Sequence, residues 1–292
     1  MKEIYLTIIV PFRNEEKRIE RTIKDIEKYT EEKPFETQVI LADSHSTDGS
    51  LNIAKKYTSE IEHFEYTEPK DNIRKGKGQA IQDGISEAKG KYVMFMDADS
   101  STPIWELDKL LPYIKDYDIV AGSRYIKEPR PYQSNYFVSL FHGIKSVIEV
   151  LIFGHSRDYM AKGKQGRLRQ LISRGGNLMF SILLNQSYID QRCGFKLYRT
   201  NVAKLLASMQ RIYGFGFDTE YWAIAQKYKL KTIEIPVEWF DDAASKVDPI
   251  KDTINSFKDI FKVQWNLLTG KYSKKNARKK LGDLAEEFIL NK

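Results

Sequence analysis

The sequence predicts an α/β protein with a mostly parallel β-sheet flanked by helices. In its first 125 residues, short runs of β-branched and other apolar residues alternate with longer segments in which apolar residues recur every three or four positions. This alternation is typical of βαβ units, whose helices cover both faces of a parallel sheet. Hydrophobic residues make up 41% of the 292 positions, which is enough to form a sizeable core.

Strands and helices are expected to alternate through this first part of the chain. The strand segments are short, apolar and rich in β-branched residues, and they lie at residues 5–10, 38–42, 92–96 and 118–121. The helix segments have apolar residues at spacings of three and four, and they lie at residues 16–29, 50–57, 76–88 and 104–115. Polar or charged residues follow each strand segment. Because parallel sheets bind ligands at the carboxyl ends of their strands, we expect the site along that edge.

The second part of the chain adds further strands and a helix. Residues 194–198 and 231–239 are predicted strands, and residues 217–228 are a predicted helix. No internal repeat, low-complexity tract or long Gly/Ser/Pro linker is present, so composition marks no clean domain boundary.

Two amphipathic helices lie beside basic segments. Between 136 and 153 the apolar residues fall on one helical face, and a basic segment follows between 157 and 174. Residues 254–268 form a second apolar stripe, which is followed by a basic cluster from 271 to 280. Such helices either dock on anionic lipid or pack as ordinary core, and the sequence leaves both alternatives open.

Charge and cysteine content narrow the function classes. Lys and Arg number 47 against 40 Asp and Glu, which gives a formal charge of +7 and a sequence pI of about 9.1. This balance favours an anionic partner, which is nucleic acid, phospholipid or a phosphorylated substrate. The single cysteine, Cys193, excludes an internal disulfide framework and a cysteine-cluster metal site. With no signal segment and no membrane-spanning apolar run, we expect a cytoplasmic protein that meets membranes only at their surface.

The sharpest motif is Asp97-Ala98-Asp99, which directly follows a strongly apolar strand segment. Where a strand gives way to a turn, carboxylates two residues apart can converge on one hard cation, while diphosphate oxygens and water fill its other positions. An Asp-x-Asp pattern is also common in solvated turns, but its place after a buried strand favours a metal site.

Two further motifs suit a nucleotide. Asp43 ends another apolar run and is placed to accept hydrogen bonds from a ribose or a base, although a well-capped strand-to-helix turn explains it equally. Lys77 lies between Gly76 and Gly78 at the predicted start of a helix, where backbone amides attract phosphate. The spacing is not that of a Walker loop, which argues against an ATPase.

In their order along the chain, these motifs resemble those of glycosyltransferase family 2. The matching segments before residue 125 are 10–15 (Val-Pro-Phe-Arg-Asn-Glu), 43–49, 76–90, 97–103 and 122–124 (Gly-Ser-Arg). Segments at 190–196, 217–220 and 245–247 resemble the branch that makes dolichyl-phosphate glucose or mannose. The resemblance covers nearly all of residues 4–265, and the order of motifs over that length is more specific than any single motif.

The resemblance implies a fold and a domain organisation. Members of the family are inverting enzymes with a GT-A fold, a Rossmann-like α/β architecture. On this basis we expect a GT-A domain over residues 1–245, with an amphipathic insertion at about 131–170 that is a candidate for facing a membrane. Amphipathic and basic helices are expected over residues 246–292.

The resemblance also implies roles for single residues. Those expected to bind the nucleotide sugar are Pro11, Arg13, Glu15, Asp43, Lys77, Asp97 and Ala98. Asp97 and Asp99 are expected to bind Mg²⁺ or Mn²⁺, and the acceptor phosphate is expected to lie on Arg124, Ser173 and Arg174. The expected catalytic residues are Asp99, Arg124, Arg174 and Asp218. Family members with hydroxyl acceptors often keep a base near Asp218 and Glu220; here we expect these acids to orient cations or substrate, or only to stabilise a helix start.

The implied function is inverting transfer of a hexose from a nucleotide sugar to dolichyl or another polyprenyl phosphate, on the cytoplasmic face of a membrane. The Gly-Lys-Gly motif is more similar to the glucosyl branch, which favours UDP-glucose over GDP-mannose. A phosphate acceptor is already anionic near neutral pH and needs no strong general base. The alternatives are transfer to a hydroxyl of a soluble or lipid-linked glycan, a sugar-phosphate nucleotidyltransferase, and a basic binding protein. Because the basic clusters lack interleaved aromatic residues, we expect no nucleic-acid partner.

Overall fold

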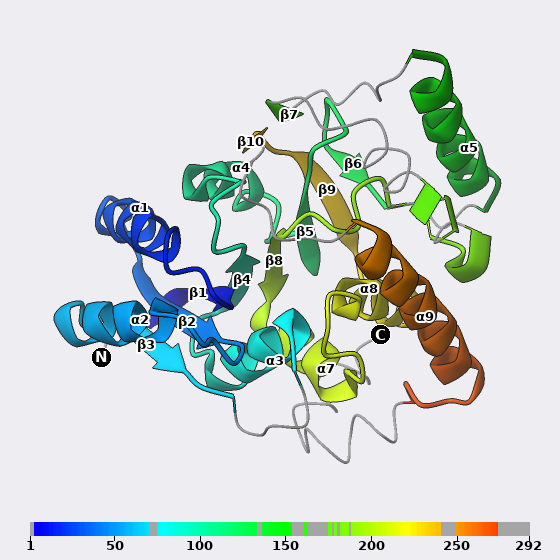
Figure 1. The fold of residues 1–292 in the computed structure, drawn as a ribbon. Helices are drawn as coiled ribbons and strands as arrows, with labels where there is room; N and C mark the ends of the chain where they lie inside the picture. Colours follow the sequence, from blue (N-terminus) through cyan, green and yellow to red (C-terminus); the bar gives the residue numbers. More distant parts are fainter. Residues whose placement is uncertain are drawn as a thin grey trace.

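The computed structural model describes residues 3–69, 75–132, 136–153, 161–162, 175–176, 178–179, 182–186, 188–240 and 249–273. Within them, strands form an eight-stranded sheet in the order β3-β2-β1-β4-β8-β5-β9-β6 (Figure 1). The bounds of these strands are Ile4–Phe12 (β1), Glu36–Asp43 (β2), Phe64–Thr67 (β3), Tyr92–Met96 (β4), Ile119–Ser123 (β5), Arg130–Pro131 (β6), Phe195–Arg199 (β8) and Thr232–Pro236 (β9). A separate two-stranded sheet pairs β7 (Ala161–Lys162) with β10 (Trp239–Phe240).

The sheet has a parallel half and a mixed half. β1 runs parallel to both β2 and β4, and β2 runs parallel to β3. In the other half, β8 runs antiparallel to both of its neighbours, β4 and β5, while β9 is parallel to β5 and β6 is antiparallel to β9. The predicted mostly parallel α/β sheet is confirmed, and the strands β3, β6 and β7 are additions to the predicted set. The strand predicted over residues 231–239 is divided between β9 and β10.

Helices cover both faces of this sheet. Their bounds are Ile19–Glu31 (α1), Ser50–Glu60 (α2), Lys77–Glu87 (α3), Leu107–Leu110 (α4), Tyr136–Phe153 (α5), Thr200–Met209 (α7), Phe217–Lys227 (α8) and Pro249–Leu268 (α9). One core cluster lies between the sheet and α1, α2 and α4, and the other lies between the sheet and α3, α7, α8 and α9. Strand β1 supplies both clusters in alternation, because successive side chains of a strand point to opposite faces: Leu6, Ile8 and Val10 face the first cluster and Ile9 the second.

The helix predicted over residues 104–115 is shorter than expected. The structure has a single 3₁₀ turn at Ile104–Glu106 followed by α4, and turns continue to residue 116. Pro112 lies just after the end of α4, and a proline lacks the backbone N–H that a continuing α-helix needs. The apolar periodicity was correct, since Leu107, Leu110 and Ile114 are fully buried, but it continues beyond the helix itself.

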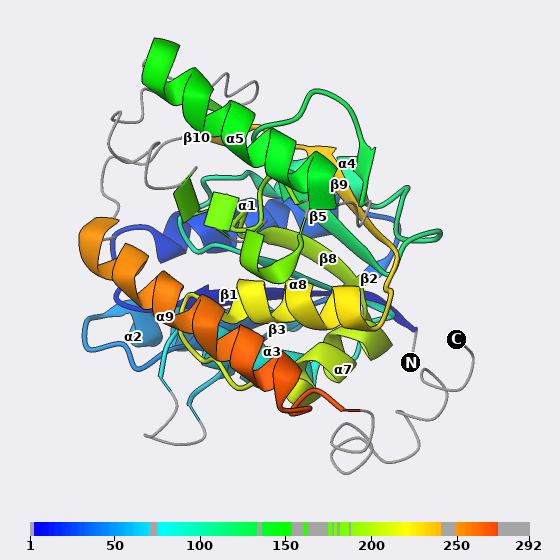
Figure 2. The same ribbon diagram turned by 90° about the vertical axis from the view of Figure 1, so that its right-hand side faces the viewer.

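Helices α5 and α9 lie on the same side of the molecule, at the right in Figure 1 and facing the viewer in Figure 2. Among the described side chains of α5, Phe137 is 78% exposed and Leu151 is 66% exposed. On α9, Ile260 and Val263 are buried against the core, whereas Trp265 is 65% exposed and lies on the outer surface together with Phe261 and Leu268. No helix in the described part of the chain is long and apolar enough to cross a membrane.

Candidate active site

The carboxyl ends of β1, β2 and β4 meet at one edge of the sheet. Phe12 at the end of β1 lies opposite Asp43 at the end of β2. Asp97 and Asp99 follow directly from the end of β4, which is the other neighbour of β1. The acidic residues of two separate motifs, Asp43 and the pair Asp97 and Asp99, therefore lie along one edge of the sheet.

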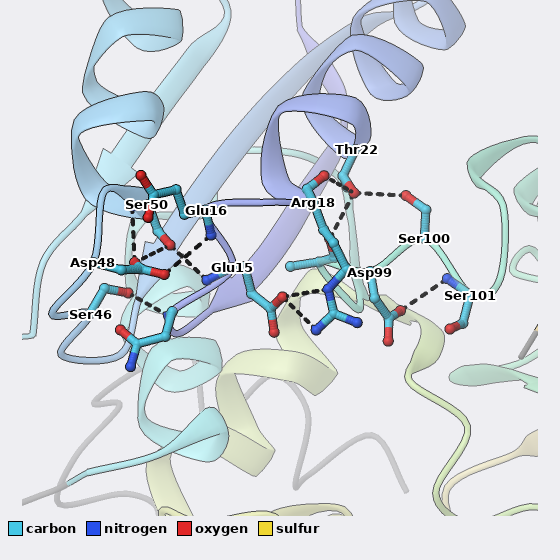
Figure 3. A network of polar contacts seen from close by, with 12 residues as sticks. Glu15, Glu16, Arg18, Thr22, Ser46, Asp48, Ser50, Asp99, Ser100 and Ser101 are labelled. Atoms are coloured by element: carbon cyan, nitrogen blue, oxygen red, sulfur yellow. Dashed lines mark hydrogen bonds and ion pairs between the residues drawn. The ribbon is translucent and has the colours of Figure 1, made fainter. Parts of the chain in front are cut away.

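Asp97 and Asp99 lie in a tight turn after β4. Ser100 has a positive φ of 52°, and Asp99 Oδ1 accepts a hydrogen bond from the backbone N–H of Ser101 at 2.9 Å (Figure 3). Burial raises the pKa of Asp99, and repulsion from the Asp97 carboxylate raises it further. A divalent cation relieves this repulsion, so the oxygen donors present fit Mg²⁺ or Mn²⁺. Among the described residues no group of three His, Cys, Asp or Glu side chains is placed to hold a metal, so such a cation would also need oxygens from a ligand or water.

Lys77 reaches the same carboxylates from the first residue of α3. Its Nζ forms an ion pair with Asp97, and its side chain is 14% exposed. Burial lowers the pKa of Lys77, but the nearby carboxylates, Asp97 foremost, outweigh burial and raise it overall. The flanking glycines allow a close approach: Gly76 has a φ of +122°, and a Cβ on Gly78 would lie 2.7 Å from Cβ of Phe217. The two glycines of the Gly-Lys-Gly motif therefore allow the close packing that places Lys77 beside Asp97.

A second ion pair, Lys196 with Asp218, is buried. The Nζ of Lys196, a side chain with no exposed surface, donates to Asp218 Oδ1 at 2.6 Å and to the carbonyl oxygen of Cys193 at 2.7 Å. Burial raises the pKa of Asp218, and the charges of Lys196 and Lys77 oppose that rise. Asp218 therefore lies between two lysines, one of which reaches the Asp97 carboxylate at the edge of the sheet.

Hydrogen bonds join the loops after β1 and β2. The backbone N–H of Glu15 donates to Ser50 Oγ at 2.7 Å, and that of Asn14 donates to Ser46 Oγ at 3.1 Å (Figure 3). Both carboxylate oxygens of Asp43, which is 4% exposed, accept from the backbone N–H of Ser46. Asp43 thus performs the turn-stabilising task that its sequence context allowed, in a loop fixed against the first.

The remaining predicted donor residues differ in exposure. Glu15 forms an ion pair with Arg18 at 2.6 Å, close to Asp99 in Figure 3. Pro11 is buried within β1, and Arg13 is exposed. Ala98 is buried, and its carbonyl oxygen accepts a hydrogen bond from the hydroxyl of Thr22 at 2.7 Å. Ala98 therefore anchors the turn of the two aspartates to α1.

Arg124, which follows β5, is held by a buried acid. Its Nε and Nη2 each donate to Asp190 at 2.7 Å, and its backbone N–H donates to the same carboxylate at 2.9 Å. The guanidinium also lies 5.3 Å from the ring centre of Trp239. Asp190 is 2% exposed on its side chain, so the arginine has a fixed orientation. The other predicted acceptor residues, Ser173 and Arg174, lie outside the described residues.

A family model described as "Glycosyl transferase family 2" matches residues 7–203. The matched residues include Asp43, Asp97, Asp99, Lys77, Arg124 and Lys196. The chain belongs to this family. The resemblance seen in its motifs is thereby confirmed, and the protein is a glycosyltransferase.

Curated relatives match this family 2 transferase over most of its length. A dolichyl-phosphate beta-glucosyltransferase of Dictyostelium discoideum is 28% identical over 284 residues, which cover 91% of this chain and 76% of the relative. The human dolichyl-phosphate beta-glucosyltransferase is 27% identical over 286 residues, which cover 94% and 79%. The similarity therefore extends beyond the family core into the last helices.

Solved structures share the fold of this transferase. Mannosyl-3-phosphoglycerate synthase from Rubrobacter xylanophilus superposes with a TM-score of 0.61 at 15% identity, covering 92% of this chain and 75% of the other. Glucosyl-3-phosphoglycerate synthase from Mycobacterium tuberculosis, solved with Mn²⁺, UDP and glucosyl-3-phosphoglycerate, gives 0.60 at 15% identity, covering 90% and 80%. At this identity the likeness establishes the architecture alone.

Sequence reasoning did not predict the two buried ion pairs of this family 2 transferase. Asp190 and Lys196 are both part of the 190–196 segment that carried the resemblance, but the segment gave no indication of their partners. The partners are Arg124 and Asp218, which are 66 and 22 residues away. The signal that could have found one of them is Lys196, a lysine among the apolar residues of β8, since a buried charge needs a partner.

Proposed function

We propose that this protein transfers glucose, with inversion, from UDP-glucose to dolichyl phosphate or another polyprenyl phosphate. The observation that carries the proposal is the grouping of Asp97, Asp99 and Lys77 at the carboxyl edge of the sheet. A pair of carboxylates for a divalent cation and a lysine at a helix start are what recognition of a nucleoside diphosphate requires. Similarity along most of the chain to dolichyl-phosphate beta-glucosyltransferases supports the choice of sugar and acceptor.

In this proposal the donor lies across the loops after β1, β2 and β4. Asp99, with Asp97 beside it, would hold Mg²⁺ or Mn²⁺, which neutralises charge on the departing diphosphate. Lys77 adds positive charge beside the same carboxylates. The loop of residues 11–15 and Asp43, which hydrogen bonds fix to each other, would hold the nucleoside. A structural neighbour solved with Mn²⁺ and UDP supports this choice of cation and nucleotide.

The acceptor side suits a group that is already ionised. Asp218 stands where hydroxyl-using relatives keep a base, but here it is buried and pairs with Lys196. A phosphate oxygen can attack the anomeric carbon of the sugar directly as the nucleoside diphosphate leaves from the opposite face, with no proton to remove. We assign the acceptor phosphate to Arg124, Ser173 and Arg174, with Asp190 fixing the orientation of the arginine.

We further propose that the transferase works on the cytoplasmic surface of a membrane. Helices α5 and α9, which both carry exposed apolar side chains, lie on one side of the molecule (Figure 2). Exposed lysines accompany them, at positions 145 on α5 and 258 and 262 on α9. Apolar residues next to basic ones suit an anionic lipid surface. The division into a GT-A domain with a membrane-facing insertion and C-terminal helices is part of this proposal.

The activity is tested by transfer of label into lipid. Labelled glucose from UDP-glucose and labelled mannose from GDP-mannose are offered with dolichyl phosphate or with a soluble glycan, with and without EDTA. We expect EDTA-sensitive glucose label in the solvent-extracted dolichyl phosphate only. Label in the glycan alone would replace the proposed acceptor, and label from GDP-mannose would replace the proposed donor.

The membrane surface is tested with two matched tryptophans. Trp265 lies on α9 and is 65% exposed, whereas Trp105 is 53% exposed in the 3₁₀ turn beside α4, on the opposite face of the sheet. We expect Trp265→Ser to weaken co-sedimentation with phosphatidylserine vesicles about tenfold, because an interfacial tryptophan is lost. Trp105→Ser should bind like the wild type. Equal binding by all three proteins contradicts the proposed surface.

A further inference from the structure

Glu220, the second acid of the 217–220 segment, is a buried residue in the first turn of α8. Residues two apart on a helix point about 200° apart, so Glu220 and Asp218 lie on nearly opposite sides of α8. Glu220 has no exposed surface. Its carboxylate accepts hydrogen bonds from the backbone N–H of Arg211 and of Ile212, both at 2.9 Å, and from the hydroxyl of Tyr272 at 2.6 Å. Three donors thus converge on one buried acid.

The two backbone donors belong to residues 210–216, which join α7 to α8 and which we term the α3 clamp. The clamp contacts the start of α3 directly. The carbonyl oxygen of Tyr213 accepts from the backbone N–H of Gln79 at 3.1 Å, and Gln210 Nε2 donates to the carbonyl oxygen of Gly78 at 2.8 Å. A Cβ on Gly76 would lie 2.8 Å from the same Tyr213 oxygen, so the two segments touch without spare room. Lys77 lies between these contacts.

The third donor connects the α3 clamp to α9. Tyr272 lies just after α9 and is fully buried, and its hydroxyl also accepts from Asn266 Nδ2 at 3.1 Å. A second contact runs the same way, because Lys262 of α9 donates to the carbonyl oxygen of Arg211 at 3.4 Å. In Figure 1, α9 lies against α8, on the same face of the sheet as α3 and α7. A continuous set of hydrogen bonds therefore runs from the end of α9 to the helix that carries Lys77.

We propose that Glu220 is a positioning residue that ties the placement of Lys77 to the seating of α9. It holds the amides of the α3 clamp, the clamp holds the first turn of α3, and that turn presents Lys77 to Asp97. Tyr272 makes this support depend on α9. The consequence for donor binding rests on the proposed function, whereas the placement of α3 does not.

The placement of α3 is tested in ligand-free protein with a matched pair of tyrosines. Tyr272→Phe removes the hydroxyl that donates to Glu220. Tyr228→Phe removes a hydroxyl at the same junction, which donates to the backbone carbonyl of Tyr272 at 3.0 Å and does not contact Glu220. We expect hydrogen–deuterium exchange in residues 77–82 to become several-fold faster in Tyr272→Phe and to stay at the wild-type rate in Tyr228→Phe. Equal rates in the two variants overturn the proposal.

Donor binding is tested with a double-mutant cycle. UDP-glucose binding in the presence of Mn²⁺ is measured for Glu220→Gln, Lys77→Met and the double variant. We expect Glu220→Gln to weaken binding about three- to tenfold in the wild-type background and to add little in the Lys77→Met background, because coupled residues are not additive. Full additivity overturns the proposal, since a residue that supports only general stability loses the same factor in both backgrounds. If the wild type binds no nucleotide sugar, the proposed function fails, and the exchange experiment still decides the role of Glu220.

Discussion

Two pairs of acids with the same spacing, Asp97 with Asp99 and Asp218 with Glu220, occupy opposite kinds of environment. The first pair follows a strand, and Asp97 keeps 40% of its side chain exposed. The second pair lies in the first turn of α8, where Asp218 is 5% exposed and Glu220 is not exposed at all. In the sequence the two patterns look alike, and each was a candidate for catalysis. Their difference comes entirely from the backbone that carries them.

Backbone geometry decides what each pair can bind. In the turn after β4, two carboxylates come close enough to repel each other, which is the condition that a divalent cation relieves. On a helix the same spacing separates the side chains, so Asp218 meets Lys196 while Glu220 meets backbone amides and Tyr272. An acid pair is therefore a metal-site candidate at the end of a strand and a structural pair within a helix.

The largest expected effect tests the pair after β4, Asp97 and Asp99. In Asp99→Asn we expect transfer to fall about 10³-fold, as when a main stabiliser of developing charge is removed. Stability should be retained, because burial and Asp97 already disfavour the ionised carboxylate at this position. The matched control is Asp116→Asn, an exposed acid in the turn before β5. Transfer rates and thermal unfolding of both variants give the comparison, and EDTA-sensitive transfer at the wild-type rate in Asp99→Asn contradicts the metal assignment.

The buried pair should respond in the opposite way, by losing stability. Asp218→Asn leaves the ammonium of Lys196, which has no exposed surface, without a charged partner. We expect the free energy of unfolding to fall by about 3 kcal/mol, as for other broken buried ion pairs. Adding Lys196→Met should restore part of the loss, because the unpaired charge is then gone. Urea unfolding measures all three proteins, and an Asp218→Asn variant as stable as the wild type but inactive would assign Asp218 to catalysis instead.

Within the second pair, Glu220 should make stability depend on pH. Burial raises the pKa of Glu220 to about 7 from an ordinary value of 4.5, against the hydrogen bonds from Tyr272, Arg211 and Ile212 and the charge of Lys262. Between these two values the folded state then binds more protons than the unfolded state. The contribution of Glu220 to the free energy of unfolding is therefore complete below pH 4.5 and is lost as the pH rises through about 7.

This titration is isolated by comparing the wild type with Glu220→Gln. Between pH 5 and pH 8 we expect the wild type to lose about 2 kcal/mol more unfolding free energy than the variant, which has no group to ionise at this position. Urea unfolding at several pH values measures it. Parallel curves for the two proteins would show that Glu220 keeps an ordinary pKa.

Local patterns account for the parts of the fold that the sequence predicts. Alternating apolar runs locate β1, β2, β4 and β5, and the polar residues after them mark the edge of the sheet that carries the candidate site. The antiparallel insertion of β8 between β4 and β5 could not be predicted in this way, because the direction of a strand depends on how a distant connection returns. Periodicity also misplaced the end of the helix after Ile104, since buried apolar residues continue past Pro112.

The residues of the candidate site also fall into two groups, those that local patterns could place and those that they could not. The positions of Asp97, Asp99 and Lys77 at the edge of the sheet could be predicted, because each follows or begins an element whose boundary is visible in the sequence. The partners of Arg124 and Lys196 were not found, because the pairs join residues that are far apart along the chain. Their side chains meet only once the sheet has assembled. Motif order identified the family, whereas burial and pairing could be assigned only from the folded chain.

The smallest expected effect compares two glycines, Gly90 just before β4 and Gly194 just before β8. A Cβ on Gly194 would lie 2.6 Å from Oδ1 of Asp97, and the end of a side chain can move away. A Cβ on Gly90 would lie 2.6 Å from the backbone nitrogen of Thr7 in β1, which cannot. Gly194→Ala should therefore displace the Asp97 carboxylate and leave the sheet intact.

We expect Gly194→Ala to weaken UDP-glucose binding with Mn²⁺ about tenfold, which corresponds to about 1.4 kcal/mol, while its thermal unfolding stays close to that of the wild type. Gly90→Ala should show the reverse, with a lower unfolding temperature and unchanged donor binding below it. Calorimetric titration and thermal unfolding of the two variants give the result. Lost stability with unchanged binding in Gly194→Ala would mean that Asp97 can leave its present place without consequence for the donor. Asp99 and Lys77 alone would then define the candidate donor site.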